Sequence, residues 1–175
     1  MKDILAKYID DQNLLWLFGQ VIDSFYTAGK TNVGLPLGNL TSQLLVNIYM
    51  NEFDQFVKRR LKIKYYLRYA DDFVFLSESK DELIALKPQI EEFLDKYLNL
   101  TLHPEKTFFK TLASGVDFLG WVQFSGYRTL RTKTKRLMLK RIEASDKPAT
   151  LAAYAAMLKH GNAYKLSDKA GLLNL

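Results

Sequence analysis

The spacing of apolar residues predicts two helices in the first third of the chain. Between residues 10 and 26, large apolar side chains recur every three or four positions, which is the stripe of an amphipathic helix. A similar stripe runs from residue 45 to 57, with Asn39 or Thr41 as the expected N-cap. Glycines and a proline between residues 27 and 39 predict a loop that joins the two helices.

The middle of the chain carries the pattern of a β-hairpin followed by a helix. Aromatic and branched residues fill 65–69 and 73–76, on either side of Ala70-Asp71-Asp72. Ser79 then begins a capping-box pattern that predicts the start of a helix. Pro88 is expected to kink or divide this helix.

The second half of the chain predicts further strands and helices. Strand-like runs lie at 107–112 and 116–124, and helical stretches lie at 132–144 and 149–159. Elements in this order predict an α+β fold, in which an antiparallel sheet has helices on one face. A run of cations that starts at Arg128 marks the expected boundary between a sheet domain over 1–127 and a small helical segment over 128–175.

Composition narrows the chemistry that the chain can carry. It has 175 residues, 48% of them hydrophobic, and 25 Lys and Arg against 19 Asp and Glu, which is typical of a folded domain with net positive charge. No cysteine and only two histidines are present, so we expect any metal to be held by oxygen ligands. No secretion signal or membrane-spanning run is recognisable, and we expect a soluble, cytoplasmic protein with no membrane partner.

Asp71 and Asp72 are the first candidates for chemistry. Two adjacent carboxylates at the tip of a hairpin can hold Mg²⁺, which usually takes one or two carboxylates together with substrate phosphates. The alternative is an ordinary turn, because Asp is common in turns. A tight hairpin turn, however, usually has Asn-Gly or Asp-Gly, and a second Asp gives up that glycine. This departure favours a functional site.

Three other segments have both a functional and a structural interpretation. The loop at 34–43 and the helix start that follows can present backbone N–H groups to a phosphate, or can simply cap a core helix. Lys106 can protonate a leaving pyrophosphate, or can be a solvated turn residue. The cations from Arg128 to Arg141 fit either a nucleic-acid backbone or a solvated helix face.

In this order, the segments resemble the palm and early thumb of bacterial reverse transcriptases. The sequence Tyr69-Ala70-Asp71-Asp72 resembles the catalytic aromatic-x-Asp-Asp hairpin of the family. Residues 34–43 resemble the serine-bearing loop of the family, and residues 100–107 resemble its Leu-x-Leu-x-x-x-Lys-Thr element. Residues 118–121 resemble its primer-grip turn, and residues 158–162 resemble the end of its thumb. The resemblance implies a partial polymerase palm, without the fingers and the first palm strand, followed by a small helical thumb segment.

The resemblance also implies an RNA-directed DNA polymerase, a nucleotidyltransferase with two Mg²⁺ ions, template RNA, a DNA primer and deoxynucleoside triphosphates. It assigns Asp71 and Asp72 as metal ligands, with Lys106 as a further catalytic residue. The implied nucleotide contacts are Leu37, Gly38, Ser42, Gln43 and Asn47. The implied primer and template contacts are Leu119, Gly120, Trp121, Arg128, Arg131, Lys133, Lys135 and Arg136.

The form of the serine loop is most similar to reverse transcriptases of diversity-generating retroelements, from bacteria or phages, because Leu37 stands where group II intron enzymes usually have Gln. The first metal-binding strand of the family has no recognisable counterpart, so we expect this chain alone to be inactive and its parent to polymerise. The alternatives are a non-catalytic nucleic-acid-binding remnant and a group II intron type enzyme with maturase activity. An accessory protein and self-association through an open sheet edge are further expectations.

Overall fold

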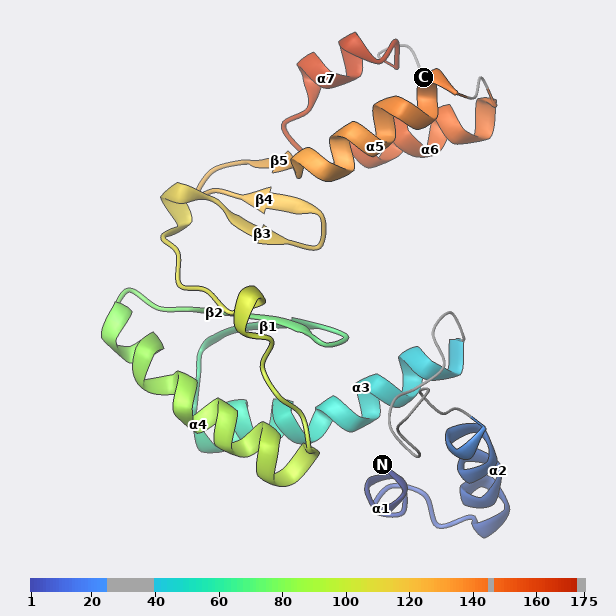
Figure 1. Ribbon diagram of the computed structural model, residues 1–175, viewed down its shortest axis with the longest axis vertical. Helices are drawn as coiled ribbons and strands as arrows, with labels where there is room; N and C mark the ends of the chain where they lie inside the picture. Colours follow the sequence, from blue (N-terminus) through green and yellow to red (C-terminus); the bar gives the residue numbers. More distant parts are fainter. Residues whose placement is uncertain (25–39, 145–146, 173–175) are drawn as a thin grey trace. The chain divides into compact units, whose positions relative to one another are not determined.

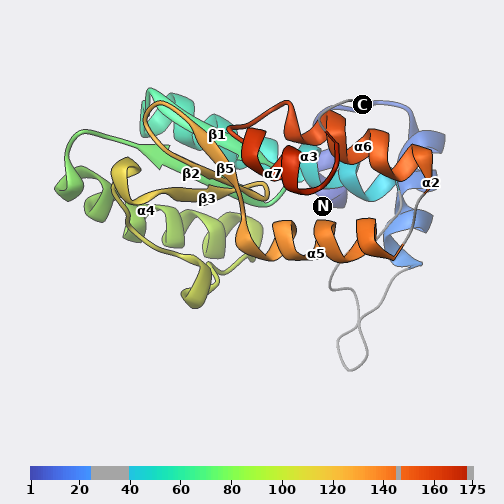
Figure 2. The same cartoon turned by 90° about the horizontal axis from the view of Figure 1, so that it is seen from above.

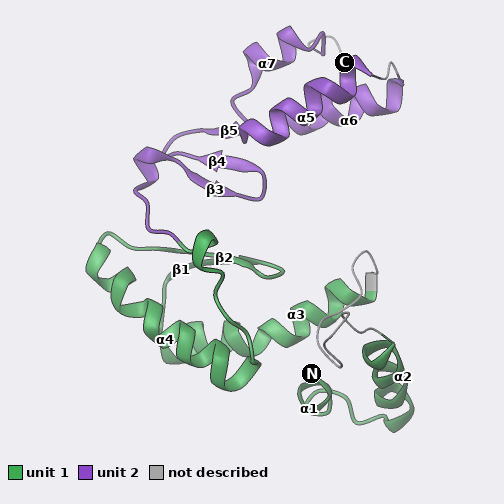
Figure 3. Ribbon diagram, in the orientation of Figure 1, with its two compact units in different colours: residues 1–107 green, residues 108–175 purple. Residues whose placement is uncertain are grey.

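The computed structural model describes residues 1–24, 40–144 and 147–172, in which helices are mixed with short antiparallel strands (Figure 1). The chain forms two compact units, Met1–Thr107 and Phe108–Leu175 (Figure 3). The α+β class is therefore confirmed, whereas the functional division into palm and thumb at residue 128 stays a prediction. No described helix combines the length and the apolar character needed to cross a bilayer.

The first unit contains one two-stranded sheet and several helices. Its elements are α1 (Lys2–Leu5), α2 (Gln12–Asp23), α3 (Leu40–Gln55), a π-helical turn (Phe56–Arg60), β1 (Tyr65–Tyr69), β2 (Asp72–Leu76), α4 (Lys80–Leu98) and a 3₁₀ turn (Pro104–Lys106). The two predicted helices before residue 60 and the predicted hairpin are confirmed. The loop expected at 27–39 and the Asn39 cap lie outside the described residues, and Thr41 lies inside α3.

Helix α4 begins where the capping pattern predicts it. The Ser79 hydroxyl accepts a hydrogen bond from the Glu82 N–H at 3.3 Å, and Asn99 ends the helix in a left-handed conformation with a φ of 48°. The helix continues through Pro88, so the proline does not divide it, and the expected kink stays a prediction. Pro88 lies on the exposed side, while apolar residues before and after it pack into the same core, so one buried face spans the proline.

An aromatic core places the hairpin on α3 and α4. Figures 1 and 2 show the two helices side by side on one face of the β1–β2 sheet. Phe53 of α3 is fully buried, and its ring centre lies 5.0 Å from that of Phe73 and 6.0 Å from those of Tyr66 and Phe93. Ring contacts at these separations add to the gain from burial. The inward face of the hairpin is thereby fixed, and the two aspartates at its end stay exposed.

The second unit joins a three-stranded antiparallel sheet to a group of helices. Its elements are a 3₁₀ turn (Leu112–Ser114), β3 (Val116–Phe118), β4 (Trp121–Gln123), β5 (Arg128–Leu130), α5 (Thr132–Glu143), α6 (Pro148–Leu158) and α7 (Tyr164–Lys169). The strand order is β3-β4-β5, and the core forms around Met138 and Leu158. The predicted helices at 132–144 and 149–159 are confirmed, while β5 and α7 were not predicted.

Two predicted strands differ from the structure. Residues 107–112 form no strand, since Phe108, Phe109 and Lys110 are all exposed and no alternation buries one side. The run at 116–124 is two strands, because Leu119 and Gly120 adopt φ angles of 53° and 82° and reverse the chain between them.

Candidate functional site

The hairpin brings Asp71 and Asp72 to an exposed two-residue turn. Tyr69 pairs with Asp72 across the hairpin, so Ala70 and Asp71 alone reverse the chain. We call residues 69–72 the Asp71 turn. Ala70 has a φ of 52°, a left-handed conformation that strains a residue with a side chain. The turn therefore presents two exposed carboxylates on a backbone that is not relaxed.

A partly buried arginine ties this turn to α3. The Nε and Nη2 atoms of Arg68 donate to Oδ1 and Oδ2 of Asp54 at 2.8 and 2.5 Å, which makes a bidentate pair. Its Nη1 donates to the Ala70 carbonyl at 2.7 Å and to Oδ1 of Asn47 at 3.2 Å. The Tyr66 hydroxyl donates to Oδ1 of Asp54 at 2.7 Å. Side chains of α3 and β1 thereby hold the backbone of the Asp71 turn.

The surroundings keep Asp54 ionised. Burial by itself favours the neutral acid, but the hydrogen bonds from Arg68 and Tyr66 and the charge of Arg68 outweigh it, so the pKa of Asp54 lies below its usual value of 3.8. The hydrogen bond to Asp54 raises the pKa of Arg68. Burial, and then the bond to Asp54, raise the pKa of Tyr66. The ion pair therefore stays charged at neutral pH, and Tyr66 stays a hydrogen-bond donor.

The structure brings part of the predicted nucleotide site to the Asp71 turn. Leu37 and Gly38 lie outside the described residues. Ser42 is 8% exposed, whereas Gln43 and Asn47 are exposed one helical turn apart on α3. The hydrogen bond between Asn47 and the guanidinium connects this helix face to the hairpin. The face that carries Gln43 and Asn47 therefore borders the Asp71 turn.

The structure connects Lys106 less closely to the predicted metal ligands Asp71 and Asp72. Lys106 is exposed in its 3₁₀ turn, and no described ion pair joins it to Asp71 or Asp72. Within residues 1–24, 40–144 and 147–172, His, Asp and Glu side chains form no cluster of three or more that could hold a metal ion. Asp71 and Asp72 are hard oxygen donors, which fit part of a Mg²⁺ coordination sphere that phosphates and waters complete.

In the second unit, the predicted primer-grip residues form a hairpin turn that is packed on one side. Leu119 and Gly120 make the turn before Trp121, and Leu119 is 45% exposed. The guanidinium of Arg128 lies 5.3 Å from the centre of the Trp121 ring. A Cβ on Gly161 would lie 2.0 Å from Cζ3 of that ring, so the indole packs there because residue 161 is glycine. Trp121 thus anchors the turn to the helical part of its unit.

The predicted nucleic-acid cations fall into two groups. Arg128 donates to a backbone carbonyl, that of His160, and Arg131 forms an ion pair with Asp117. These two arginines connect parts of the second unit to each other. The exposed cations of α5 that take part in none of the described salt bridges are Lys133, Lys135, Arg136, Lys140 and Arg141, and the first three of them are predicted template contacts.

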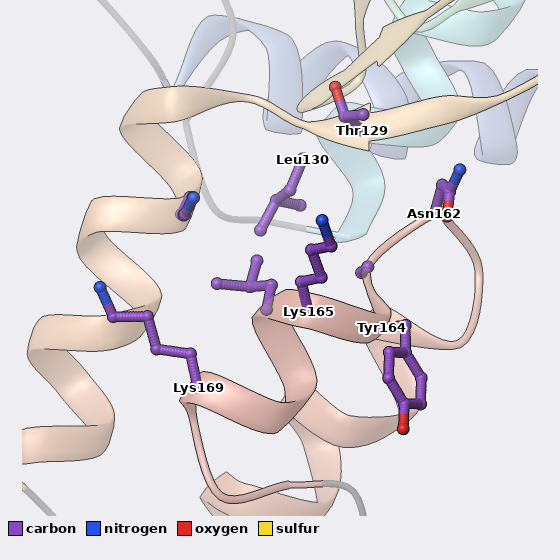
Figure 4. Close-up of a pocket in the computed structure, with 9 residues that line it drawn as sticks. Thr129, Leu130, Asn162, Tyr164, Lys165 and Lys169 are labelled. Carbon is purple, nitrogen blue, oxygen red and sulfur yellow. The ribbon is translucent and has the colours of Figure 1, made fainter.

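A pocket of about 630 Å³ adds further cations beside α5. Figure 4 shows Lys165 and Lys169 extending from α7 into the space between α7, α5 and β5, while Tyr164 points away from them. The residues that line the pocket are Thr129, Leu130, Lys135, Asn162, Ala163, Tyr164, Lys165, Leu166 and Lys169. Three of these described residues are lysines and none is acidic, so the pocket suits an anionic ligand.

Comparison with known sequences places the hairpin in a family. Residues 5–123 match the family described as reverse transcriptase (RNA-dependent DNA polymerase), a stretch that contains α3, the Asp71 turn and the turn before Trp121. The chain belongs to the reverse transcriptase family. The chain is similar to Protein YkfC of Escherichia coli (strain K12), with 29% identity over 66% of this chain and 40% of that protein. The chain thus spans about two fifths of the length of the curated relative.

Three residues that support the Asp71 turn, Asp54, Tyr66 and Arg68, were not predicted from the sequence. The alternation of side chains along β1 contains a signal for two of them. Tyr66 and Arg68 share the face of the strand that points inward, while the residues between and beside them point outward. Because a charge on an inward face needs a partner, Arg68 indicates an acidic residue on the element that covers it.

Proposed function

We propose that this chain is the palm and thumb portion of an RNA-directed DNA polymerase and that its hairpin carries part of the centre for nucleotidyl transfer. The observation that carries the proposal is a pair of exposed carboxylates on a strained turn whose backbone is held from α3. That turn lies inside the stretch that matches the reverse transcriptase family. Strain of this kind is characteristic of functional sites, where the surrounding structure stabilises it.

In this proposal, Asp71 and Asp72 donate carboxylate oxygens to Mg²⁺. When bound, the metal ions of such a centre stabilise the attacking and leaving oxygens of the displacement. Lys106 is proposed to supply a proton on the pyrophosphate side. The proposed contacts to the nucleotide are Leu37, Gly38, Ser42, Gln43 and Asn47. Of these, Gln43 and Asn47 have the strongest support, because their helix face borders the Asp71 turn.

Template RNA and DNA primer are proposed to bind the second unit. The exposed cations of α5 supply sequence-independent contacts to phosphates. The pocket beside α5 with Lys135, Lys165 and Lys169, which we call the lysine pocket, adds further cations for such contacts. Leu119, Gly120 and Trp121 are proposed to position the primer end, with Arg128 and Arg131 supporting them. Because cation–phosphate contacts release counterions, the affinity for an RNA–DNA duplex is expected to fall steeply with salt concentration.

The same proposal extends to the enzyme type and its partners. The form of the serine loop supports an enzyme of a diversity-generating retroelement in a bacterium or phage. We propose a cytoplasmic location for it. Tyr65, Leu67 and Tyr69 on the outward face of β1 are 55%, 59% and 61% exposed, and a two-stranded sheet offers open edges. We propose that the chain is inactive alone and that the rest of the polymerase, an accessory protein or a second copy covers this face.

Metal binding tests the proposal directly. Titration of the chain with Mn²⁺, followed by electron paramagnetic resonance, is expected to show binding that Asp71→Asn and Asp72→Asn each weaken by about tenfold or more. Asp95→Asn, a change at an exposed aspartate of α4, is the matched control and should leave binding unaltered. A different outcome would identify a non-catalytic binding module. In that case, the chain would bind an RNA–DNA duplex in a salt-dependent way, and neither Asp71→Asn nor Asp72→Asn would change its Mn²⁺ affinity.

A further inference from the structure

Arg68 is an unusual residue for its position in the hairpin. Its side chain is 10% exposed, although the neighbouring Leu67 and Tyr69 are 59% and 61% exposed. It lies on the inward face of β1 and reaches Asp54 and Asn47 of α3, beside a core of aromatic and aliphatic side chains. A guanidinium in such a place must have its donors satisfied, because an unpaired buried charge is strongly unfavourable.

The three nitrogens of the guanidinium are divided between two tasks. Nε and Nη2 bind both oxygens of Asp54, which fixes the plane of the guanidinium relative to α3. The Tyr66 hydroxyl binds the same carboxylate and limits its rotation. Nη1 is then directed at the Ala70 carbonyl and at Asn47, at 2.7 and 3.2 Å. The hydrogen bonds to Asp54 therefore fix the guanidinium relative to α3, and the hydrogen bond to Ala70 lets the fixed guanidinium hold the backbone of the turn.

The Ala70 carbonyl belongs to the peptide bond that leads into Asp71. Its direction sets where the backbone of Asp71 begins, since only Ala70 and Asp71 connect the paired residues Tyr69 and Asp72. Ala70 holds a φ of 52°, which an alanine keeps only when its surroundings impose it. The hydrogen bond from Arg68 is an interaction that imposes it, because it binds the carbonyl of that same residue.

We propose that Arg68, anchored by Asp54, is a positioning residue that fixes the peptide between Ala70 and Asp71 and so aims the Asp71 carboxylate at its metal ion. The inference rests on the proposed function, in which Asp71 is a metal ligand. Lysine does not replace arginine here, because one ammonium group cannot bind a carboxylate in bidentate fashion and reach the carbonyl and amide oxygens on the other side. Asp54 acts only through Arg68, so changes at the two positions are expected not to add.

The test compares Arg68→Lys and Asp54→Asn with Arg59→Lys, the same chemical change at an exposed position of the same unit. Both network variants are expected to weaken Mn²⁺ binding by about tenfold, the typical effect of losing a residue that orients a metal ligand. The double variant should bind as weakly as either single one, and Arg59→Lys should bind as the unchanged chain does. Equal Mn²⁺ affinity in Arg68→Lys and the unchanged chain would overturn the inference while leaving the metal site intact.

A second measurement does not depend on the metal. The ¹⁵N relaxation order parameter of the Asp71 amide is expected to fall from about 0.85 toward 0.6 in Arg68→Lys, while that of Phe75 in β2 stays near 0.85. A merely structural role would lower both values, and unchanged values at both positions would refute the positioning role. If the unchanged chain binds no Mn²⁺ through Asp71, the metal assignment fails, and the order parameters still decide whether Arg68 fixes the turn.

Discussion

Replacing Gly161 with alanine should destabilise the second unit through a clash with Trp121. The added Cβ would lie 2.0, 2.6 and 2.9 Å from three carbons of the indole ring, where ordinary contacts are about 3.5–4.0 Å. The ring must therefore move by more than about 1 Å, and it packs against its own core on one side. Overpacking of this kind costs about 1–3 kcal/mol. Loss of the Arg128 contact over the ring adds about 0.5–1 kcal/mol.

The expected loss is thus about 2–3 kcal/mol, which lowers the melting temperature of a unit of this size by roughly 15 °C. Trp16 and Trp121 are the two tryptophans of the chain, and Trp16 is 66% exposed in the first unit. In a Trp16→Phe background, urea unfolding followed by fluorescence therefore reports on Trp121 alone. Gly126→Ala is the matched control, because nothing lies within 4 Å of its Cβ position.

The control should change the free energy of unfolding by less than about 0.5 kcal/mol. A second comparison, followed by circular dichroism because the fluorescent residue is replaced, combines Gly161→Ala with Trp121→Leu, which removes the ring that the new methyl group meets. The two changes should couple by about 1–2 kcal/mol, the glycine substitution costing less once the indole is gone. If Gly161→Ala and Gly126→Ala unfold at the same urea concentration, the packing argument is refuted.

Three further predictions concern the core, the ion pair and the lysine pocket. Phe53→Ala should lower the free energy of unfolding of the first unit by about 3–5 kcal/mol, against less than about 1 kcal/mol for Leu44→Ala in the same helix, measured by circular dichroism in urea. The lowered pKa of Asp54 means that the unfolded chain binds more protons, so stability should fall as pH drops below about 4, and Asp54→Asn should remove that part of the pH dependence. Lys165→Gln with Lys169→Gln should weaken RNA–DNA duplex binding and reduce the slope of log K against log salt by about 2, as fluorescence anisotropy would show.

Local patterns predicted the elements that do not depend on distant partners. The stripes of α2 and α3, the hairpin and the start of α4 at Ser79 follow from periodicity and capping, and the structure contains all of them. Strand β5 was missed because its three residues, Arg128–Leu130, have one apolar side chain among them and gain strand structure by pairing with β4. Short segments of this kind are set by tertiary pairing more than by their own preference.

The sequence predicted the two carboxylates of the candidate site, but it did not predict the residues that hold their turn in place. Asp71 stands out in the sequence because the acidic pair interrupts a hairpin. Asp54 and Arg68 are 14 residues apart and meet only after β1 has packed on α3. The contact between Trp121 and Gly161 likewise joins segments from different elements, so spacing alone could not indicate it. Contacts of this kind emerge from packing, which a single sequence does not encode in any local pattern.

The left-handed residues at the two hairpin tips are positions where selection for stability and selection for activity should favour different amino acids. Ala70 and Leu119 both hold positive φ angles that glycine or asparagine would adopt more easily. A screen that rewarded folding alone should therefore substitute these two positions early. A screen that rewarded nucleotide transfer by the parent polymerase should keep them, because a glycine turn samples more backbone conformations. Sequencing the survivors of the two screens would show whether evolution has traded some stability for stiffness at these tips.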